Sequence, residues 1–177
     1  MIGLDDRQIA GCFNAQQGRR YRVRLIGGAS EPLYLPARSS GWATIRYTRD
    51  YARSALHELA HWCLAGEARR GRVDYGYWYQ PPPRTSEQQQ LFARAEVGVQ
   101  ALESLFAEAS GLPFRVSVDD FAVEAGAEAA FAAAVTDRAH CLRTSGLPAR
   151  AEEIRRRLAE HLEIVGSCLP ESGWMRR

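Results

Sequence analysis

Residues 57–61, with the sequence HELAH, constrain this chain more than any other segment. On a helix, two histidines four residues apart lie on the same side, so the imidazoles of His57 and His61 can bind one metal ion. The adjacent side of such a helix carries apolar residues at helical spacing, namely Leu56, Leu59, Ala60 and Cys63. We therefore predict a helix with one face in the core and a metal site beside it.

The histidine content favours a metal site over the simpler interpretation of two surface histidines. The chain has only four histidines, and two of them occur at the ligand spacing with a carboxylate, Glu58, between them. A metal ion that takes part in catalysis usually has three protein ligands. A further ligand is therefore expected from another part of the chain.

Length and composition predict one domain over 1–177, because 177 residues are too few for two well-buried cores. A formal net charge of +2 argues against a protein dedicated to nucleic acids. The four cysteines are far apart, as in reduced intracellular proteins. The N-terminus is charged where a secretory signal would be apolar, and no segment approaches the roughly 20 apolar residues that span a membrane. We expect a cytoplasmic protein with no membrane contact.

The pattern along the chain predicts an α+β fold in which a small β-sheet packs against helices. Alternating residues indicate strands, glycine and proline pairs indicate breaks, and apolar residues at helical spacing indicate helices. Gly27 and Gly28 are expected to end the first strand. The expected helices are 4–15, the metal helix, 86–109, 125–142 and 149–165, and the expected strands are 21–26, 32–36, 42–47 and 74–79, with 114–118 as a further strand or an extended link.

Glu96 is the favoured third ligand, and Glu103 is its competitor. The helix expected over 86–109 has an apolar stripe, and Glu96 falls on the border of that stripe, where its carboxylate would be half buried. A buried carboxylate without a partner is unfavourable, and a metal ion offsets this cost. Glu103 lies two turns further along nearly the same edge.

The chain resembles the elongation factor P hydroxylases of bacteria. The resemblance extends over roughly residues 31–120, and its most specific parts are the DYGYWY sequence at 74–79 and the HWC sequence at 61–63. The matching segments are 31–37, 54–63, 65–70, 73–79, 96–97 with 100–102, and 111–114. The resemblance implies a zincin-like metal-binding core, with the metal held by His57, His61 and Glu96. It also implies that a hydroxyl group is added to the lysyl-modified lysine of translation elongation factor P.

Two neutral imidazoles and one carboxylate on one side of a metal are typical of non-haem Fe(II) hydroxylases that use molecular oxygen. The same ligands also suit Zn(II), and Glu58 would then be the general base of a zincin-type HExxH metallopeptidase. In a hydroxylase Glu58 would orient a ligand or handle protons. The alternatives are therefore a peptidase and, more remotely, a metal-stabilised binding protein without catalytic activity.

Two further groups are candidates for contact with the modified lysine and with elongation factor P. On a strand, Tyr75, Tyr77 and Tyr79 would share a face and could line a slot for a cationic side chain, although such a face could equally pack on the core. Arg69 and Arg70 follow the metal helix and could meet an acidic protein. Their simpler interpretation is favourable charge at the C-terminal end of a helix.

Overall fold

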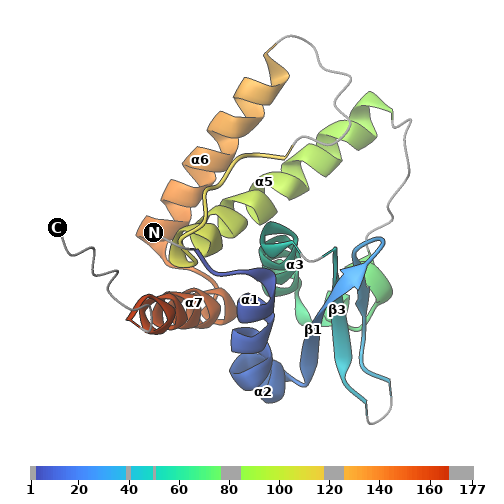
Figure 1. The fold of residues 1–177 in the computed structure, drawn as a ribbon. Helices are drawn as coiled ribbons and strands as arrows, with labels where there is room; N and C mark the ends of the chain where they lie inside the picture. The colour runs from blue at the N-terminus through green and yellow to red at the C-terminus, as the bar shows by residue number, and fades with distance from the viewer. Residues whose placement is uncertain (1–2, 39–40, 50, 77–84, 118–125, 168–177) are drawn as a thin grey trace, which may run out of the picture.

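The computed structural model describes residues 3–38, 41–49, 51–76, 85–117 and 126–167, and it has an α+β architecture (Figure 1). A small sheet lies at one side, and helices form most of the rest of the described chain. The strands are β1 (Val23–Ala29), β2 (Leu33–Leu35) and β3 (Ala43–Thr48). The helices are α1 (Asp6–Phe13), the π-helical segment η1 (Asn14–Gly18), α2 (Arg19–Tyr21), α3 (Ala52–Leu64), α4 (Glu67–Arg70), the 3-10 helix η2 (Val73–Gly76), α5 (Ser86–Ala109), α6 (Ala127–Ser145) and α7 (Ala149–Ser167).

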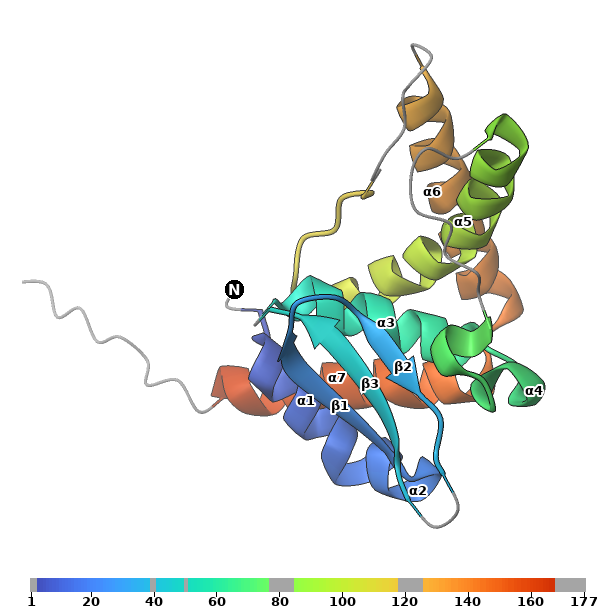
Figure 2. The same cartoon turned by 90° about the vertical axis from the view of Figure 1, so that its right-hand side faces the viewer.

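The sheet has the strand order β1-β3-β2, with β1 parallel and β2 antiparallel to β3. Leu25 pairs with Ile45 in the first ladder, and Tyr34 pairs with Ile45 in the second. Buried and more exposed residues alternate along β1 and β3, as expected for a sheet covered on one face. Figure 2 shows the helices behind this sheet, on its covered face.

Helix α3 occupies the centre of the fold, because it contacts both β3 and α5. Helix α5 also packs along α6 and against α7, and both views show α5 and α6 side by side (Figures 1 and 2). One hydrophobic cluster includes side chains from α1, the sheet, α3, α5, α6 and α7. The elements that carry the predicted metal ligands are thus held from several sides.

The N-terminal helix is longer than the expected 4–15 and contains an irregular turn. Asp5 and Gln8 form a capping box at its start, and the π-helical segment η1 follows α1. The Asn14 side chain accepts from the backbone N–H of Leu25 at 2.8 Å and donates to its carbonyl at 2.9 Å. This polar clasp joins η1 to the outer edge of the sheet, a contact that helical periodicity does not reveal.

The expected strand break at Gly27 and Gly28 is wrong, since β1 continues to Ala29. The register with β3 shifts between Ile26 and Ala29, so the glycines form an irregularity inside the strand. A Cβ at Gly27 would lie 2.6 Å from the ring of Tyr47. The glycine therefore permits the close approach of an aromatic ring whose hydroxyl donates to the Asp6 carboxylate at 2.9 Å.

The strand expected over 74–79 is also wrong where the structure describes it, because Val73–Gly76 form the 3-10 helix η2. Asp74 and Tyr75 have positive φ angles of 46° and 58°, which place both in the left-handed region. The Asp74 carboxylate accepts from the backbone N–H of Tyr34 at 2.8 Å and holds this turn against β2. Tyr77 and Tyr79 lie outside the described residues.

The expected helix over 86–109 is confirmed with both of its ends, and Thr85 caps it in a box with Gln88. The other expected strands and C-terminal helices occur with shifts of a few residues. In the part of 114–118 that is described, residues 114–117 form an extended link and not a strand.

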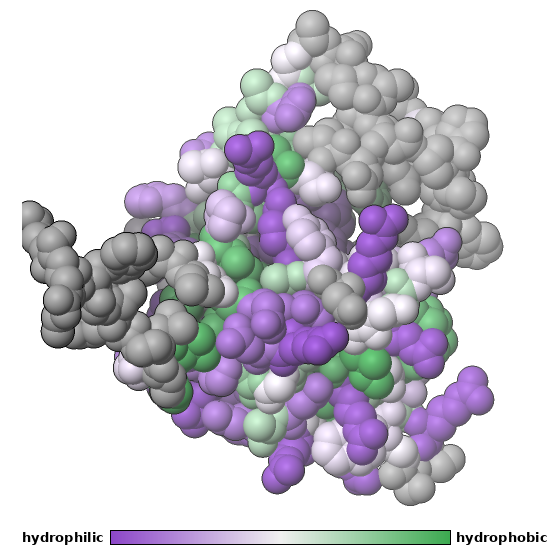
Figure 3. Space-filling model, viewed as in Figure 1, coloured by the Kyte–Doolittle hydropathy of each residue, from purple (hydrophilic) through white to green (hydrophobic). Residues whose placement is uncertain are grey.

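In the residues that the structure describes, no helix combines the length and the apolar character needed to cross a membrane. The face seen in Figure 1 is mostly hydrophilic, and its hydrophobic residues are scattered in small areas (Figure 3).

Candidate metal centre

Helix α3 presents His57, Glu58 and His61 because its other face is anchored in the core. Ala55, Leu56, Leu59 and Ala60 are completely buried, which confirms the predicted apolar side. At the start of the helix the Ser54 hydroxyl accepts from the backbone N–H of Thr48 at 3.1 Å. The first turn is therefore tied to the end of β3, and the two histidines that follow have fixed directions.

The structure brings the three expected ligands, His57, His61 and Glu96, close together. The two imidazole Nε2 atoms are 3.2 Å apart. The Glu96 carboxylate oxygens lie 3.7 Å from Nε2 of His57 and 3.5 Å from Nε2 of His61. Ligands about 2.1 Å from a metal and at mutual angles of roughly 90–110° would be about 3.0–3.4 Å apart. The cluster, named here the His-His-Glu cluster, therefore comes close to the geometry of one metal ion bound from one side.

Glu103, the competing third ligand, does not point to the same place. Its Oε2 lies 2.9 Å from Nδ1 of His57, and its Oε1 accepts from the Arg53 guanidinium at 3.0 Å. A metal-bound histidine commonly donates its second ring N–H to a carboxylate, which fixes the tautomer and the ring orientation. Glu103 is placed to do this, and it leaves the Nε2 lone pair of His57 facing Glu96 and His61.

Gln100 holds the third carboxylate from the next turn of α5. Its Nε2 lies 3.4 Å from Oε2 of Glu96 and also donates to the Ser117 carbonyl at 2.8 Å. Its Oε1 accepts from the backbone N–H of Ser117 at 2.9 Å. The extended link after α5 is thereby fastened beside the His-His-Glu cluster, and it closes one wall of the site.

The two histidines have opposite pKa shifts in the metal-free protein. Burial lowers the pKa of His57, but the hydrogen bond to Glu103 and the charges of Glu96, Glu103 and Glu58 together outweigh it and raise this pKa to about 9. For His61, burial and the neighbouring positive charge of His57 lower the pKa well below its usual value. A neutral His61 beside the Glu96 carboxylate is an environment that attracts a cation.

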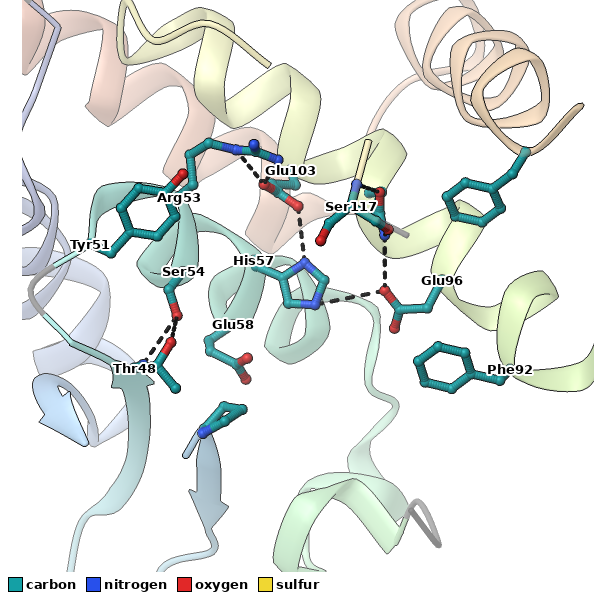
Figure 4. A pocket seen from close by; sticks show the side chains of 13 residues that line it. Thr48, Tyr51, Arg53, Ser54, His57, Glu58, Phe92, Glu96, Glu103 and Ser117 are labelled. Atoms are coloured by element: carbon teal, nitrogen blue, oxygen red, sulfur yellow. Dashed lines mark hydrogen bonds and ion pairs between the residues drawn. The ribbon is translucent and has the colours of Figure 1, made fainter. Parts of the chain in front are cut away.

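Glu58 lines the same pocket as His57 and Glu96, but it lies in a different part of that pocket. The pocket has a volume of about 450 Å³, and Figure 4 shows Glu58 and Glu96 on different sides of His57. Burial raises the pKa of Glu58 to about 7, although the positive charge of His57 opposes this shift. The pocket, called here the histidine pocket, is lined by Pro32, Thr48, Tyr51, Arg53, Ser54, His57, Glu58, Phe92, Glu96, Gln100, Glu103, Ser117 and Phe131.

Among the described candidates for substrate contact, Tyr75, Arg69 and Arg70 lie elsewhere. Tyr75 is buried, stacks on Tyr34 with ring centroids 4.2 Å apart, and lies 6.3 Å from the ring of His61, nearly parallel to it. Its ring lies beside the ring of His61, and it does not line the histidine pocket. Arg70 donates to the carbonyl of Ala65, at the C-terminal end of α3, and Arg69 is exposed. Contact of these residues with a substrate stays a prediction.

Sequence reasoning missed several residues of this site, among them Arg53, Phe92, Gln100 and Phe131. A signal for one of them was present, because Glu96, Gln100 and Glu103 recur at spacings of four and three along one helix edge. Three polar residues in a row on the border of an apolar stripe indicate a buried polar site. For Arg53, Phe92 and Phe131 no pattern of this kind exists.

Comparison with known proteins agrees with this geometry. The sequence model of the elongation factor P hydroxylase family matches residues 12–168. The chain belongs to the elongation factor P hydroxylase family. A relative from Haemophilus influenzae, named elongation factor P lysine hydroxylase, is 40% identical over 151 residues, which cover 85% of either chain. The resemblance inferred from the motifs is confirmed, and the region that matches the family includes the complete His-His-Glu cluster and the two helices that carry it.

Proposed function

We propose that this protein is a metal-dependent hydroxylase that adds a hydroxyl group to the lysyl-modified lysine of elongation factor P. Family membership supports the activity, and the name of the Haemophilus influenzae relative supports the substrate. The observation that carries the proposal is the convergence of His57, His61 and Glu96 within 4.8 Å of one another. This enzyme would act in the cytoplasm, where translation factors work.

The proposed cofactor is Fe(II), with molecular oxygen as cosubstrate. Two imidazoles and one carboxylate on one side of the ion leave its other positions open, the pattern of non-haem Fe(II) oxygenases. When bound, the iron supplies the activation of oxygen. Replacement of a C–H bond by C–OH consumes two electrons and two protons for each oxygen molecule, and the second oxygen atom leaves as water.

The histidine pocket is suited to a long cationic side chain. Phe92 and Phe131 provide apolar rings that can pack against methylene groups, and the half-exposed ring of Tyr51 lies at its edge. The carboxylate of Glu58 can accept a hydrogen bond from an ammonium group. With a pKa of about 7, Glu58 can also hold or release a proton beside the cluster.

A zincin-like core is part of the same proposal. The helix with the HELAH sequence packs against a mixed sheet, and the antiparallel edge strand β2 begins next to Pro32, which lines the pocket. The metallopeptidase alternative is not favoured, because the matching family and the Haemophilus influenzae relative are both named as hydroxylases. Zinc-loaded protein should therefore leave an unstructured polypeptide uncut, and cleavage that disappears on Glu58→Gln would support a peptidase.

Co-expression tests the proposed activity. The chain is produced with its cognate elongation factor P and the lysyl-modifying enzymes, and the translation factor is analysed by mass spectrometry. We expect the modified lysine to gain one oxygen atom. His57→Ala should abolish the gain, whereas His140→Ala, which alters an exposed histidine of α6, should preserve it. An unchanged mass with iron-loaded protein would refute the hydroxylase assignment.

A further inference from the structure

A second pocket, about 420 Å³ in volume, lies beside the C-terminal end of α3 and shares no residue with the histidine pocket. Its walls come from the start of β1, from β2 and the chain after it, and from α3, α4 and α7. We call it the arginine pocket. Its lining residues include Arg22, Arg70 and Arg150, and among the described residues no aspartate or glutamate lines it.

Arg150 is fixed in a definite position by α3. Its guanidinium lies over the ring of Trp62, with 4.7 Å between its Cζ atom and the ring centroid. One nitrogen, Nη2, donates to the carbonyls of Cys63 at 3.0 Å and Ala65 at 2.8 Å. These bonds use one edge of the planar group. A guanidinium has five N–H donors, so further donors remain for an acceptor in the pocket.

Positive charge accumulates at this place, and no carboxylate among the described lining residues balances it. Arg70 also donates to the carbonyl of Ala65, so its guanidinium and that of Arg150 meet at one acceptor. Burial and the positive charge of Arg70 lower the pKa of Arg150. Trp62, another lining residue, has a buried indole N–H without a hydrogen-bond partner among the described residues. The crowding of two guanidinium groups is of the kind that a bound anion relieves.

We propose that the arginine pocket binds a small oxyanion, with carboxylate or phosphate oxygens held by the guanidinium groups of Arg22, Arg70 and Arg150. Planar guanidinium groups bind such oxygens in pairs, and these charge-assisted hydrogen bonds are stronger than neutral ones. The Tyr34 ring also lines the pocket and supports Tyr75, which lies against His61. The anion site is thus separate from the metal site but in packing contact with it.

The binding test uses succinate and inorganic phosphate as probes, titrated by calorimetry into metal-loaded protein. Succinate represents the carboxylates and phosphate represents the phosphate esters, so the tighter probe identifies the source of the oxyanion. We expect one probe to bind with a stoichiometry of one. Arg22→Gln and Arg150→Gln should each weaken that binding by roughly tenfold or more, in keeping with the loss of a charge-assisted pair.

Two control variants distinguish binding in the arginine pocket from binding elsewhere on the protein. Arg24→Gln removes the same charge from an exposed position of β1 that does not line the pocket, so binding should persist. Binding should also persist in His57→Ala. Loss of binding in this variant would instead show that the probe is a ligand of the metal. Arg150→Gln removes bonds to α3 and can lower stability, whereas Arg22→Gln leaves those bonds in place.

Three results would overturn the proposal. The first is that neither probe binds at millimolar concentrations, and the second is that Arg24→Gln weakens binding as much as Arg22→Gln. The third is that Arg22→Gln raises the KM for elongation factor P while free succinate and phosphate do not bind. In that case the arginines would contact the protein substrate and would not form a small-molecule site. The first two results do not depend on the hydroxylase activity being correct, because they measure binding of the free probes alone.

Discussion

At the scale of single residues, the site depends on carboxylates with different tasks. Glu96 faces the two histidines, while Glu103 hydrogen bonds to the far side of His57 and is itself held by Arg53. Glu58 is buried beside them without joining the cluster. The position of each carboxylate therefore determines whether it can bind a metal, orient a ligand or move a proton.

Replacing Glu103 should weaken metal binding without removing a ligand. In Glu103→Gln the His57 ring loses its charged partner, and affinity should fall by about 10- to 100-fold, the range for such supporting contacts. The dissociation constant can be measured by competition with a chelator. Glu108→Gln is the matched control, because Glu108 lies on the same helix, is exposed and pairs only with Arg143 in the described residues. Equal affinity of both variants would contradict the role assigned to Glu103.

Metal affinity should increase with pH between about 7 and 9. The metal-free protein holds a proton on His57 up to a pKa of about 9, and this proton must leave before Nε2 can bind a metal. Each unit of pH in this range should therefore raise the affinity by up to about tenfold, with a plateau above it. Titrations in a chelator-buffered series would show this slope, and a flat profile would disprove it.

The raised pKa of His57 has the opposite effect on the stability of the metal-free protein, which should fall as the pH rises. Because the pKa of His57 is raised by folding, its stabilising contribution is complete below about 6.5 and is lost as the pH rises through about 9. The raised pKa of Glu58 acts in the same sense between about 4.5 and 7. Urea unfolding of the metal-free protein should therefore occur at lower urea concentration at pH 9 than at pH 7.

The sequence predicts part of this chemistry and misses the rest for a physical reason. The spacing of His57 and His61 follows from helix geometry alone, and the border position of Glu96 follows from the apolar stripe of its helix. The choice between Glu96 and Glu103 depends on how α3 and α5 are rotated against each other. That rotation is set by side-chain packing and by Arg53, and no repeat in the sequence encodes it.

At the scale of elements, local sequence signals predict the ends of a helix well where nearby side chains hydrogen bond to its free backbone groups. Helix α5 begins at a capping box and has its predicted ends. The segment at 73–76 fails for the opposite reason. Its alternating aromatic residues suggest a strand, but contacts with Tyr34 hold Asp74 and Tyr75 in left-handed conformations. Tertiary contacts override strand propensity there.

The clasp between η1 and β1 gives a stability prediction. Asn14→Ala removes both hydrogen bonds to Leu25 and leaves its backbone groups without these partners, which should cost about 1–3 kcal/mol of unfolding free energy. Chemical denaturation measures this change. Gln16→Ala alters an exposed residue of the same π-helical segment and should cost much less. Similar losses of unfolding free energy in both variants would show that the two hydrogen bonds of Asn14 do not stabilise the fold.

At the scale of the whole molecule, a bound metal would join the two helices that carry its ligands. His57 and His61 belong to α3, and Glu96 belongs to α5, so the ion would bind only when these helices are packed together. A ligand that binds only the folded state stabilises it by about 4 kcal/mol at a thousandfold excess over its dissociation constant. The metal is therefore expected to stabilise the entire fold.

Thermal unfolding with and without metal tests this expectation. The wild-type chain should unfold at a higher temperature with Fe(II) under anaerobic conditions, and Glu96→Ala should abolish most of the increase. Glu87→Ala, at an exposed position on the same helix, should keep it. An increase of the same size in Glu96→Ala would exclude this carboxylate from the ligand set.

The distance along the chain between α3 and α5 has a consequence for synthesis on the ribosome. When α3 emerges, its two histidines have neither Glu96 nor the Glu103 partner, because α5 has not yet been made. The carbonyls at the C-terminal end of α3 lack their Arg150 partner for longer still, because α7 is made near the end of the chain. A nascent chain should consequently hold metal weakly until α5 has been made and has packed against α3. The order of translation thus protects the early histidines from retaining whichever metal ion they meet first.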